Sequence, residues 1–572
     1  MTAQHADNVH DAHDAGAADE PASTPTLSRR KVLGGLAVGT ATLGIPSVAA
    51  AQGRNGRRDG RRNGRGRNAN PGRNDGDQRG GDQQAGQGDG ETALVGQDAG
   101  PDRFSRMFPS EPSFQEVTDE LRIQLAALGA PGGLIDAKDP LEEGPIRLIT
   151  EPELSANNRN NTTHTAGTTF VGQFLDHDIT RDGGSSLGQP TSLRRSVNLR
   201  SARFDLDSVY GGGPGEMPAL YQSDDPFRFR VESGGLFEDL PRNGDGSAIV
   251  GDPRNDENLI IAGLQVAFLK FHNAVLDRVR ASGLDGNAAF VEAQRQVRWH
   301  WQWLIVHQFL PQFVGQAMVN DVLANGRRFY TSNQAQIPVE FQTSAYRFGH
   351  SMIRPSYRAN MAGDNGEPFF GMVFDPSQFG SPDPDDMAGG SRAPRRFIGW
   401  QTFFDFGDGE VKPNKRIDTQ ISTPLFQLPM GTIETSRGEP IGPTSLATRN
   451  LLRHITWEIP SGERVAAAMN ADRLAAGDLA DIAGVAPLLE GRTPLWLYLL
   501  READLVADGN HLGPVGGRIV AEVFIGLLQL DPTSYFGSPS WRPTLPSVAG
   551  AGDFRMVDLL TIAGVDPTSR GQ

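Results

Sequence analysis

Cysteine is absent from this chain of 572 residues. Disulfide bonds, thiolate metal sites and cysteine nucleophiles are therefore excluded, and a bound metal must be held by histidine, carboxylate or carbonyl oxygen. The sequence also lacks a Gly-rich phosphate-binding loop, the His-Glu-x-x-His pair of zinc enzymes and the nucleophile elbow of serine hydrolases. These absences remove several common enzyme classes before any residue is assigned a role.

Positive charge is in deficit, because 54 Lys and Arg residues stand against 69 Asp and Glu residues, for a formal net charge of −15. A folded protein of this charge is not a general binder of nucleic acids. The 69 Gly and 39 Pro residues indicate many loops, and the 29 Phe and 7 Trp residues are enough for a substantial core. Strand-like alternation is scarce and we find no internal repeat. We therefore predict a mainly α fold with long loops and little β-structure, in one large domain over residues 100–572.

Apolar residues at helical spacing predict most of the helices of this domain. Their ranges are 113–129, 168–180, 259–279, 290–314, 341–352, 446–453, 461–469 and 516–529. The segment 251–257 is expected to open the 259–279 helix, since its Asp and Pro are placed as N-terminal signals. Loops are expected over 130–165 and 360–420.

The first 51 residues resemble an export signal. A polar, disordered leader over 1–27 precedes Arg29-Arg30, a weakly apolar run and the small residues of 49–51. The apolar run is too short and weak for a stable membrane span, so the pattern is typical of a twin-arginine signal. A chance Arg pair before a single membrane anchor is the alternative. We predict export to the periplasm or the cell exterior by the twin-arginine translocase.

Residues 52–99 have a low-complexity composition. Arg residues stand among Gly and Asn at its start: Arg54, Arg57, Arg58, Arg61, Arg62, Arg65 and Arg67. Nothing in this stretch could bury a core, so we predict a disordered, flexible linker. An anionic polymer of the cell envelope or matrix is a candidate partner for the Arg block. A spacer that only keeps the protein soluble is the alternative.

A polar group interrupts the apolar helix predicted at 168–180. At about 100° per residue, Gln173 and His177 share a face, while Asp176 and Asp178 lie on opposite flanks of His177, roughly 160° apart. The two carboxylates and the imidazole therefore cannot easily hold one ion together, and three separate roles are implied. A solvated helix end with a satisfied histidine is the alternative. Burying unpaired charge is expensive, which favours a functional site.

A second histidine, His350, lies on the apolar, aromatic helix predicted at 341–352. A core histidine is the alternative interpretation. Two buried histidines on different helices, one with a Gln and an Arg-x-x-Glu available and the other among apolar residues, match a haem site. In such a site one histidine ligates the iron and the other does acid-base work.

The residues resemble a known family at this point, the animal-type haem peroxidases (the peroxidase-cyclooxygenase superfamily) in their bacterial, exported form. The resemblance covers about residues 110–560. Four motifs in the order of the family carry it: Gln173-Phe174-Leu175-Asp176-His177-Asp178, Arg254-x-x-Glu257, Arg347-x-x-His350, and Asn450-Leu451-Leu452-Arg453 followed by Pro460.

The resemblance implies roles on the distal side of a haem b. His177 is the distal base, which takes a proton from H2O2 and delivers it to the departing oxygen, giving a ferryl intermediate. Arg254 stabilises the charge that develops along the O–O bond. Gln173 lies over the distal cavity, near the place of a small anion or water. Asp176 and Glu257 correspond to carboxylates that can form esters with haem methyl groups.

The resemblance also implies the proximal side. His350 is the axial ligand of the haem iron, and Asn450 accepts a hydrogen bond from its other ring nitrogen, which strengthens the ligand. Arg453 pairs with a haem propionate, since a guanidinium matches a carboxylate.

A calcium site is implied beside the distal histidine. In the family the residue after that histidine completes a site with a following loop. The matching oxygen ligands are Asp178, Ser201, the Arg203 carbonyl, Asp205 and Asp207. Hard oxygen ligands with several carboxylates favour Ca2+. An Asx-rich turn without a metal is the alternative.

Two departures from relatives bear on the substrate. Asn258 replaces the methionine that forms a sulfonium bond to haem in the myeloperoxidase-like member, which disfavours chloride oxidation. Arg347 occupies the position of the radical tyrosine of fatty-acid dioxygenases, and Tyr346 is expected to face elsewhere on the helix. The prediction is a haem peroxidase that uses H2O2 to oxidise halide, pseudohalide or aromatic donors. A fatty-acid dioxygenase and a non-catalytic envelope- or matrix-binding protein are the alternatives.

The remaining histidines receive plainer interpretations. His272, His300 and His307 are expected to be core or packing residues. No interaction is predicted for His164, His454 or His511.

Overall fold

The computed structural model describes residues 103–154, 157–390, 392–429 and 442–572. The chain divides into two units, Met1–Asp89 and Gly90–Gln572, and every described residue belongs to the second. The predicted export signal at 1–51 and the predicted linker at 52–99 lie outside the described residues, so both stay predictions.

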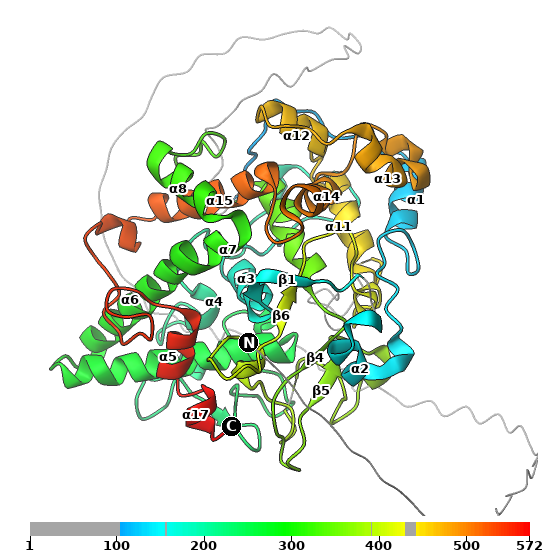
Figure 1. Cartoon of the computed structure of the whole chain (residues 1–572). Helices are drawn as coiled ribbons and strands as arrows, with labels where there is room; N and C mark the ends of the chain where they lie inside the picture. The colour runs from blue at the N-terminus through cyan, green and yellow to red at the C-terminus, as the bar shows by residue number, and fades with distance from the viewer. Residues whose placement is uncertain (1–102, 155–156, 391, 430–441) are drawn as a thin grey trace, which may run out of the picture. The chain divides into compact units, whose positions relative to one another are not determined.

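The described residues are mainly α-helical, which confirms the predicted fold class (Figure 1). The α-helices are α1 (Asp119–Leu128), α2 (Gly144–Thr150), α3 (Gly167–Ile179), α4 (Asp207–Tyr210), α5 (Leu259–Ala281), α6 (Gly286–Leu304), α7 (Leu310–Val314), α8 (Gln316–Asn325), α9 (Val339–Thr343), α11 (Leu446–Thr456), α12 (Gly462–Ala468), α13 (Ala480–Val485), α14 (Leu495–Ala507), α15 (Pro514–Leu530), α16 (Met556–Ile562) and α17 (Pro567–Arg570).

The strands of the described part are short and pair only in twos. They are β1 (Asn160–Thr165), β2 (Glu232–Ser233), β3 (Glu238–Asp239), β4 (Ser356–Arg358), β5 (Phe370–Met372) and β6 (Pro413–Lys415). The antiparallel pairs are β1 with β6, β2 with β3, and β4 with β5. With so little sheet, the helices alone must position the site.

Helix α3, near the middle of Figure 1, packs against α5, and α5 packs against α6; both lie at the lower left of the view. The ring of Phe174 on α3 stacks on Phe268 of α5 with centroids 4.8 Å apart, and Trp301 of α6 closes the group 5.0 Å from Phe268. Helix α5 is long and apolar enough to cross a membrane, but 83% of its most apolar stretch is buried inside the domain. It is therefore the core helix against which α3 is fixed.

The segment predicted to open this core helix has its own short structure. Asp252 caps a 3-10 turn, η5 (Pro253–Asp256), by accepting from the backbone N–H of Arg254. Asn258 then caps α5 by accepting from the N–H of Ile261 at 2.9 Å. The side chains of Arg254, Asn255 and Glu257 contact α3 from the break between the two caps. We call residues 252–258 the distal loop.

The helix predicted at 290–314 is present, but its middle is wound as a π-helix instead of an α-helix. It runs as α6, then one π-helical turn, η6 (Ile305–Phe309), then α7. Pro311 has no N–H to donate into an α-helical ladder, which accounts for the local change. The turn leaves His307 exposed at the surface, so it is not a core residue, but its ring stacks on Trp303, as expected of a packing residue.

The predicted helix 341–352 is also divided. Helix α9 ends before Ser344, whose φ of −124° and ψ of −68° break the ladder, and a 3-10 helix, η7 (Ala345–Met352), follows. In a 3-10 helix residues three apart lie on one face. The side chains of Arg347 and His350 therefore lie on the same face of η7. In an α-helix they would be about 60° apart around the axis.

Other boundaries differ from the expectations. Helix α1 begins only at Asp119, because Thr118 caps it by accepting from the N–H of Leu121. The range 130–165, expected to be loop, contains α2 and β1. The apolar helix α14 and the helix α8 were not predicted. The helices expected at 446–453, 461–469 and 516–529 correspond to α11, α12 and α15.

Gly389 permits the distal loop to pack closely. A Cβ atom at this position would overlap the backbone carbonyl of Asp256. We expect Gly389→Ala to lower the free energy of unfolding by about 1–3 kcal/mol, because the loop must shift to admit the methyl group. Chemical denaturation measures the change. Gly484→Ala is the control, since a Cβ there meets nothing within 4 Å; equal effects of the two substitutions would contradict the prediction.

Candidate active site

The predicted site residues of the distal and proximal sides meet around one cavity of about 290 Å³. It lies between α3, the distal loop and η7. The residues that line it include Gln173, Asp176, His177, Arg254, Glu257, Asn258, Tyr346, Arg347, His350, Arg449 and Arg453, with apolar side chains such as Phe313, Phe348 and Phe374 between them. Of the predicted cofactor residues, Asn450 lies behind His350 and not in the wall itself.

His177 is buried at the end of α3 and is held by a residue that the sequence motifs did not identify. Its Nδ1 lies 2.9 Å from Oδ1 of Asn255 in the distal loop, and its Nε2 lies 3.4 Å from Oε1 of Glu257 at the cavity. Asn255 is the first of the two residues that the Arg-x-x-Glu motif leaves unspecified. Only its contact with α3 in the folded chain reveals a role.

The orientation of the Asn255 amide requires a hydrogen on Nδ1 of His177 and so fixes the tautomer of the neutral ring. The Asn255 Nδ2 donates to Gln265 Oε1 at 2.8 Å and to the carbonyl oxygen of Ser208 at 3.5 Å. A carbonyl oxygen can only accept, so this side of the amide must be the nitrogen. Oδ1 then faces Nδ1 of His177, which must carry a hydrogen. The neutral imidazole therefore presents its lone pair at Nε2, towards the cavity.

Arg254 is directed by a buried carboxylate. Its Nε and Nη2 donate to Asp252 at 3.0 Å each, and Nη2 also donates to the carbonyl oxygens of His177 and Thr180. Burial would raise the pKa of Asp252, but the hydrogen bonds and charge of Arg254 outweigh it and lower that pKa. The Nη1 of Arg254 faces Asp176 at 3.6 Å. A fixed cation thus borders the cavity beside His177.

Glu257 connects the distal residues to one another. Its Oε1 accepts from Nε2 of Gln173 and lies beside His177, while Asn258 donates to Oε1 of Gln173 at 3.4 Å. The adjacent Asp256 is held by Arg242, whose two terminal nitrogens donate to it at 2.8 and 3.0 Å. The distal loop is therefore braced on both sides.

On the proximal side, His350 faces the cavity from η7. Asn450 of α11 places its amide 2.8 Å from Nδ1 of His350, as the resemblance implied. Burial first, then the charges of Arg347 and Arg453, lowers the pKa of His350 to about 3, so the imidazole is neutral. A neutral imidazole is the form that ligates a metal.

The Asn450 amide contains an orphaned polar atom. Its Nδ2 faces His350, whereas its Oδ1 is buried without a hydrogen-bond partner among the described residues. A half-turn of the amide exchanges the two atoms and lets Oδ1 accept from Nδ1–H. Only that arrangement leaves the lone pair of Nε2 free for a metal. The donor set therefore fits an iron-bound histidine.

His454 supports this arrangement from behind, and its role was not predicted. Its Nδ1 lies 3.0 Å from the carbonyl oxygen of Asn450, and its Nε2 accepts from the Ser344 hydroxyl and the Trp496 N–H. Burial lowers the pKa of His454 to about 4. This neutral histidine joins α11 to the break before η7 and to α14.

Three arginines gather at the proximal wall of the cavity: Arg347, Arg449 and Arg453. Burial and then the neighbouring Arg453 lower the pKa of Arg347 to about 9 and that of Arg449 to about 10. Arg453 also lies 3.6 Å from Asp182. This concentration of positive charge fits an anionic group in the cavity, and two carboxylates of a haem edge match it. The sequence interpretation assigned only Arg453 to this role.

Tyr346 lines the cavity, so the prediction that it faces elsewhere is wrong. Its hydroxyl donates to the carbonyl oxygen of Gly172 on α3 at 2.9 Å, and its ring stacks on Phe341. The long phenol side chain reaches α3 across the cavity edge, a contact that helix periodicity alone does not indicate. Tyr346 thereby ties the proximal segment to the distal helix.

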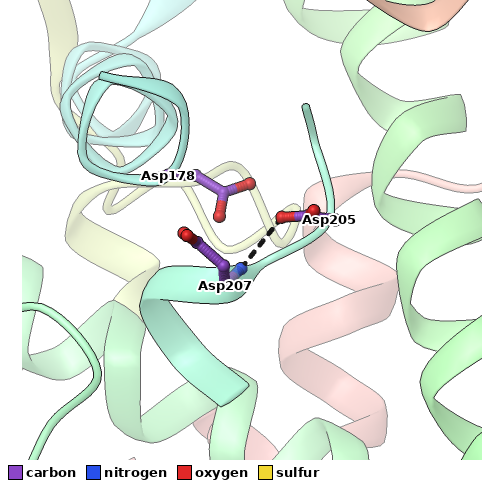
Figure 2. A group of neighbouring side chains, drawn as sticks. All are labelled: Asp178, Asp205 and Asp207. Carbon is purple, nitrogen blue, oxygen red and sulfur yellow. Dashed lines mark hydrogen bonds between the residues drawn. The ribbon is translucent and has the colours of Figure 1, made fainter. Parts of the chain in front are cut away.

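Asp178 directly follows His177 in the sequence. The carboxylates of Asp178, Asp205 and Asp207 converge (Figure 2). One oxygen atom from each lies within 4.8 Å of the others. Ser201 joins them by donating to Asp205 at 2.8 Å. Arg203 lies in the same loop with an exposed side chain. The structure thus brings together the side chains predicted to bind calcium.

The loop of this carboxylate group is held in an unusual conformation. Leu206 has a φ of +62°, a left-handed conformation that costs energy for a residue with a Cβ. It lets the N–H of Leu206 donate to Asp178 at 3.1 Å. Burial, followed by repulsion from its two neighbours, raises the pKa of Asp178, and burial raises that of Asp207 to about 6. A divalent cation would compensate this charge.

The other histidines have identifiable neighbours. His272 is buried and lies 2.9 Å from the Tyr210 hydroxyl, and His300 is buried with Nε2 accepting from the N–H of Thr544, as expected of core residues. His164 contacts Asn414 at 3.1 Å. His511 contacts a backbone carbonyl.

Sequence comparison gives a family match. Residues 180–388 match the sequence model described as animal haem peroxidase, a range that contains Arg254, Glu257 and His350. The chain is 24% identical to the peroxidasin homologue pxn-2 of Caenorhabditis elegans over 189 residues, or 30% of this chain and 14% of that protein. It is 27% identical to peroxidase skpo-1 of the same organism over 172 residues, or 30% of this chain and 26% of that protein. The matches span a minor part of these relatives.

Two solved structures share the fold. Peroxidase A from Dictyostelium discoideum has a TM-score of 0.51 and 16% identity, over 76% of this chain and 88% of that chain. A fatty acid alpha-dioxygenase from Oryza sativa has a TM-score of 0.50 and 13% identity, over 74% of each chain. These two likenesses show a shared helical fold. Residues 180–388 match the animal haem peroxidase family, as the motifs predicted.

The Asn255 contact makes a prediction about His177. Asn255→Ala is expected to release Nδ1, so that both imidazole tautomers are populated, and to slow the reaction with H2O2 by about 10–100-fold. Nitrogen-15 chemical shifts of labelled histidine measure the tautomer ratio without any cofactor. Asn255→Asp keeps an acceptor at Nδ1 and should retain the wild-type tautomer. An unchanged spectrum in Asn255→Ala would disprove the assignment.

Proposed function

We propose that this protein is an exported haem peroxidase that reduces H2O2 and oxidises small anionic or aromatic donors. The placement of His177 and His350 on one cavity carries the proposal, because an acid-base residue and a neutral axial ligand are the two groups such an enzyme requires. The family match supports it independently. The predicted twin-arginine signal supports export, and an anionic envelope polymer is the proposed partner of the Arg-rich linker.

The residues fit a haem b. His350 would hold the iron, with Asn450 as the acceptor behind it, and Arg347, Arg449 and Arg453 would neutralise the propionates. When bound, the haem iron supplies the two-electron reduction of the peroxide bond and the one-electron oxidation of donors. The chain itself supplies proton transfer, charge stabilisation and orientation.

His177 moves the proton. Its Nε2 is the only unprotonated nitrogen of the neutral ring, and it faces the cavity. It can take a proton from the near oxygen of H2O2 and return it to the far oxygen, which leaves as water. Asn255 keeps the other nitrogen protonated through both steps.

Arg254 stabilises the charge that develops on the departing oxygen. Asp252 and two backbone carbonyls fix its guanidinium, so little rearrangement is needed when the charge appears. Gln173 lies between Glu257 and Asn258 and orients the peroxide or a small anion. Asn258 cannot supply a thioether link, so iodide, bromide, thiocyanate or phenols are the proposed donors in preference to chloride.

Two further features belong to the proposal. Asp176 and Glu257 both line the cavity and are the proposed points of ester attachment to haem methyl groups. Ca2+ is proposed to bind Asp178, Asp205 and Asp207, with Ser201 and the Arg203 carbonyl completing the ligand set. Because Asp178 follows His177 directly, the ion would fix the end of α3.

Tyr346 gives a second candidate function, fatty-acid dioxygenation. Its phenol lies in the cavity wall, where a tyrosyl radical could abstract hydrogen from a lipid. Oxygen uptake with an unsaturated fatty acid distinguishes this activity. The peroxidase proposal predicts H2O2-dependent donor oxidation without such uptake.

His177→Ala is expected to leave haem binding intact and to slow the reaction with H2O2 by about 10²–10⁴-fold, the usual contribution of general acid-base catalysis. Stopped-flow absorption at the Soret band measures the rate. His511→Ala, half-buried at a backbone carbonyl, should react at the wild-type rate. A His177→Ala protein as fast as wild type would refute the role of this histidine.

Replacing Asp176 and Glu257 together by Ala is expected to make haem extractable with acidified organic solvent, since ester bonds survive that treatment and axial ligation does not. The wild-type protein, after turnover with H2O2, should retain its haem. Retention of haem by the double variant would remove both carboxylates from the proposed linkage.

Ca2+ is expected to raise the melting temperature of the wild-type protein above its value in EDTA, because a ligand of the folded state stabilises it by mass action. Asp178→Asn should shrink this shift, and Asp364→Asn, at an exposed position, should keep it. Equal shifts in all three proteins would show that the ion does not use this carboxylate group.

A further inference from the structure

Four side chains at the C-terminal end of α6 form a cluster that the proposed haem chemistry does not use. Trp303 stacks on His307 with centroids 3.7 Å apart, and Tyr535 lies 5.8 Å from Trp303 and 5.7 Å from Trp541. We call Trp303, His307, Tyr535 and Trp541 the α6 cluster. It combines three rings that can be oxidised by one electron with one imidazole.

Two oxidisable rings of the α6 cluster each have a proton acceptor. The Tyr535 hydroxyl lies 3.4 Å from Nε2 of His307, and Trp303 Nε1–H donates to Asp553 at 3.2 Å. A phenol that loses an electron becomes a strong acid, so an adjacent neutral imidazole can take its proton. Ordinary packing of aromatic rings does not require either acceptor. The pairing is suited to reversible oxidation of Tyr535.

The α6 cluster reaches the surface. His307 is exposed, Trp541 is partly exposed, and the exposed Arg542 places its guanidinium 5.6 Å from the Trp303 ring centre. Tyr535 is nearly buried beneath them, at 7% exposure. A donor at this surface can therefore contact the cluster edge without entering the cavity.

A further tryptophan lies between the α6 cluster and the cavity. Trp301 is fully buried on α6, two residues before Trp303, and its ring meets Phe174 of α3 edge-on at 6.4 Å. Phe174 follows Gln173, which lines the cavity wall. Trp301 thus lies against α3, the helix that supplies Gln173 to that wall. Trp303 lies on the opposite face of α6 and belongs to the α6 cluster, so electrons would cross the helix between these two indoles.

We infer that the α6 cluster is a second oxidation site, at which phenolic groups carried on polymers too large for the cavity give up electrons. The inference rests on the proposed peroxidase function, which supplies the oxidant. Trp301 and Trp303 conduct electrons from Tyr535 towards the haem site, and Tyr535 is the residue that the donor reduces.

Atoms and electrons balance over each cycle. Tyr535 releases one electron inward and its hydroxyl proton to His307 Nε2, and becomes a neutral phenoxyl radical. A donor phenol then returns one electron, while His307 returns the proton, and the donor leaves as a phenoxyl radical after losing its own proton to water. Two such cycles for each H2O2 yield two water molecules, and the two donor radicals couple to each other.

The test uses the full-length holoprotein and two donors. Iodide enters the cavity, whereas a phenol coupled to agarose beads cannot. Wild-type protein with H2O2 is expected to oxidise both, and Tyr535→Phe is expected to oxidise iodide at the wild-type rate but the bead-bound phenol several-fold more slowly. Electron paramagnetic resonance after one equivalent of H2O2, without donor, should show a tyrosyl signal that Tyr535→Phe loses.

Tyr221→Phe is the matched control, because Tyr221 is a buried tyrosine that contacts Phe290 near the other end of α6. It should keep both the bead oxidation and the radical signal. Trp303→Phe removes the route while leaving Tyr535, and should also lose the bead oxidation. The second site would be overturned if Tyr535→Phe kept both the bead oxidation and the radical signal, and if Trp303→Phe kept the bead oxidation. A wild-type protein that oxidises no iodide would instead overturn the peroxidase function itself.

Discussion

The hydrogen bond between His177 Nδ1 and Asn255 Oδ1 is the contact on which the distal side of the cavity depends. It joins α3 to the distal loop across 78 residues of sequence, and it fixes the tautomer of neutral His177. It forms only because the loop is held in place by Asp252 and Arg254 within it and by Arg242 outside it. Without these contacts, His177 would be buried with Nδ1 unpaired. With them, Nδ1 donates to Asn255 and Nε2 faces the cavity.

The distal and proximal sides are also connected to each other. Tyr346 of η7 donates to the backbone of α3, and Asp178, directly after His177, belongs to the carboxylate group with Asp205 and Asp207. Helix α3 is therefore held in three places. It packs on α5, it accepts a hydrogen bond from Tyr346 of η7, and its C-terminal end belongs to the carboxylate group. This rigidity is what electrostatic stabilisation requires, since preorganised groups need no rearrangement during the reaction.

Sequence reasoning recovered the residues whose neighbours are set by local spacing. His177, Arg254, Glu257 and His350 fall in short motifs, and the helix period places them on defined faces. It missed Asn255, because its importance arises from a contact with a distant helix. It misjudged Tyr346, because the phenol reaches the cavity wall through a contact with Gly172 on a distant helix. Long-range packing accounted for both errors.

The absorption spectrum of the protein purified with haem supplied tests the central claim most directly. The account predicts a Soret band of histidine-ligated haem that shifts rapidly when one equivalent of H2O2 is added, and returns when iodide or a phenol follows. Haem that fails to bind, or a Soret band that does not respond to H2O2, would contradict the account, because the site would then lack either its axial ligand or its distal acid-base pair.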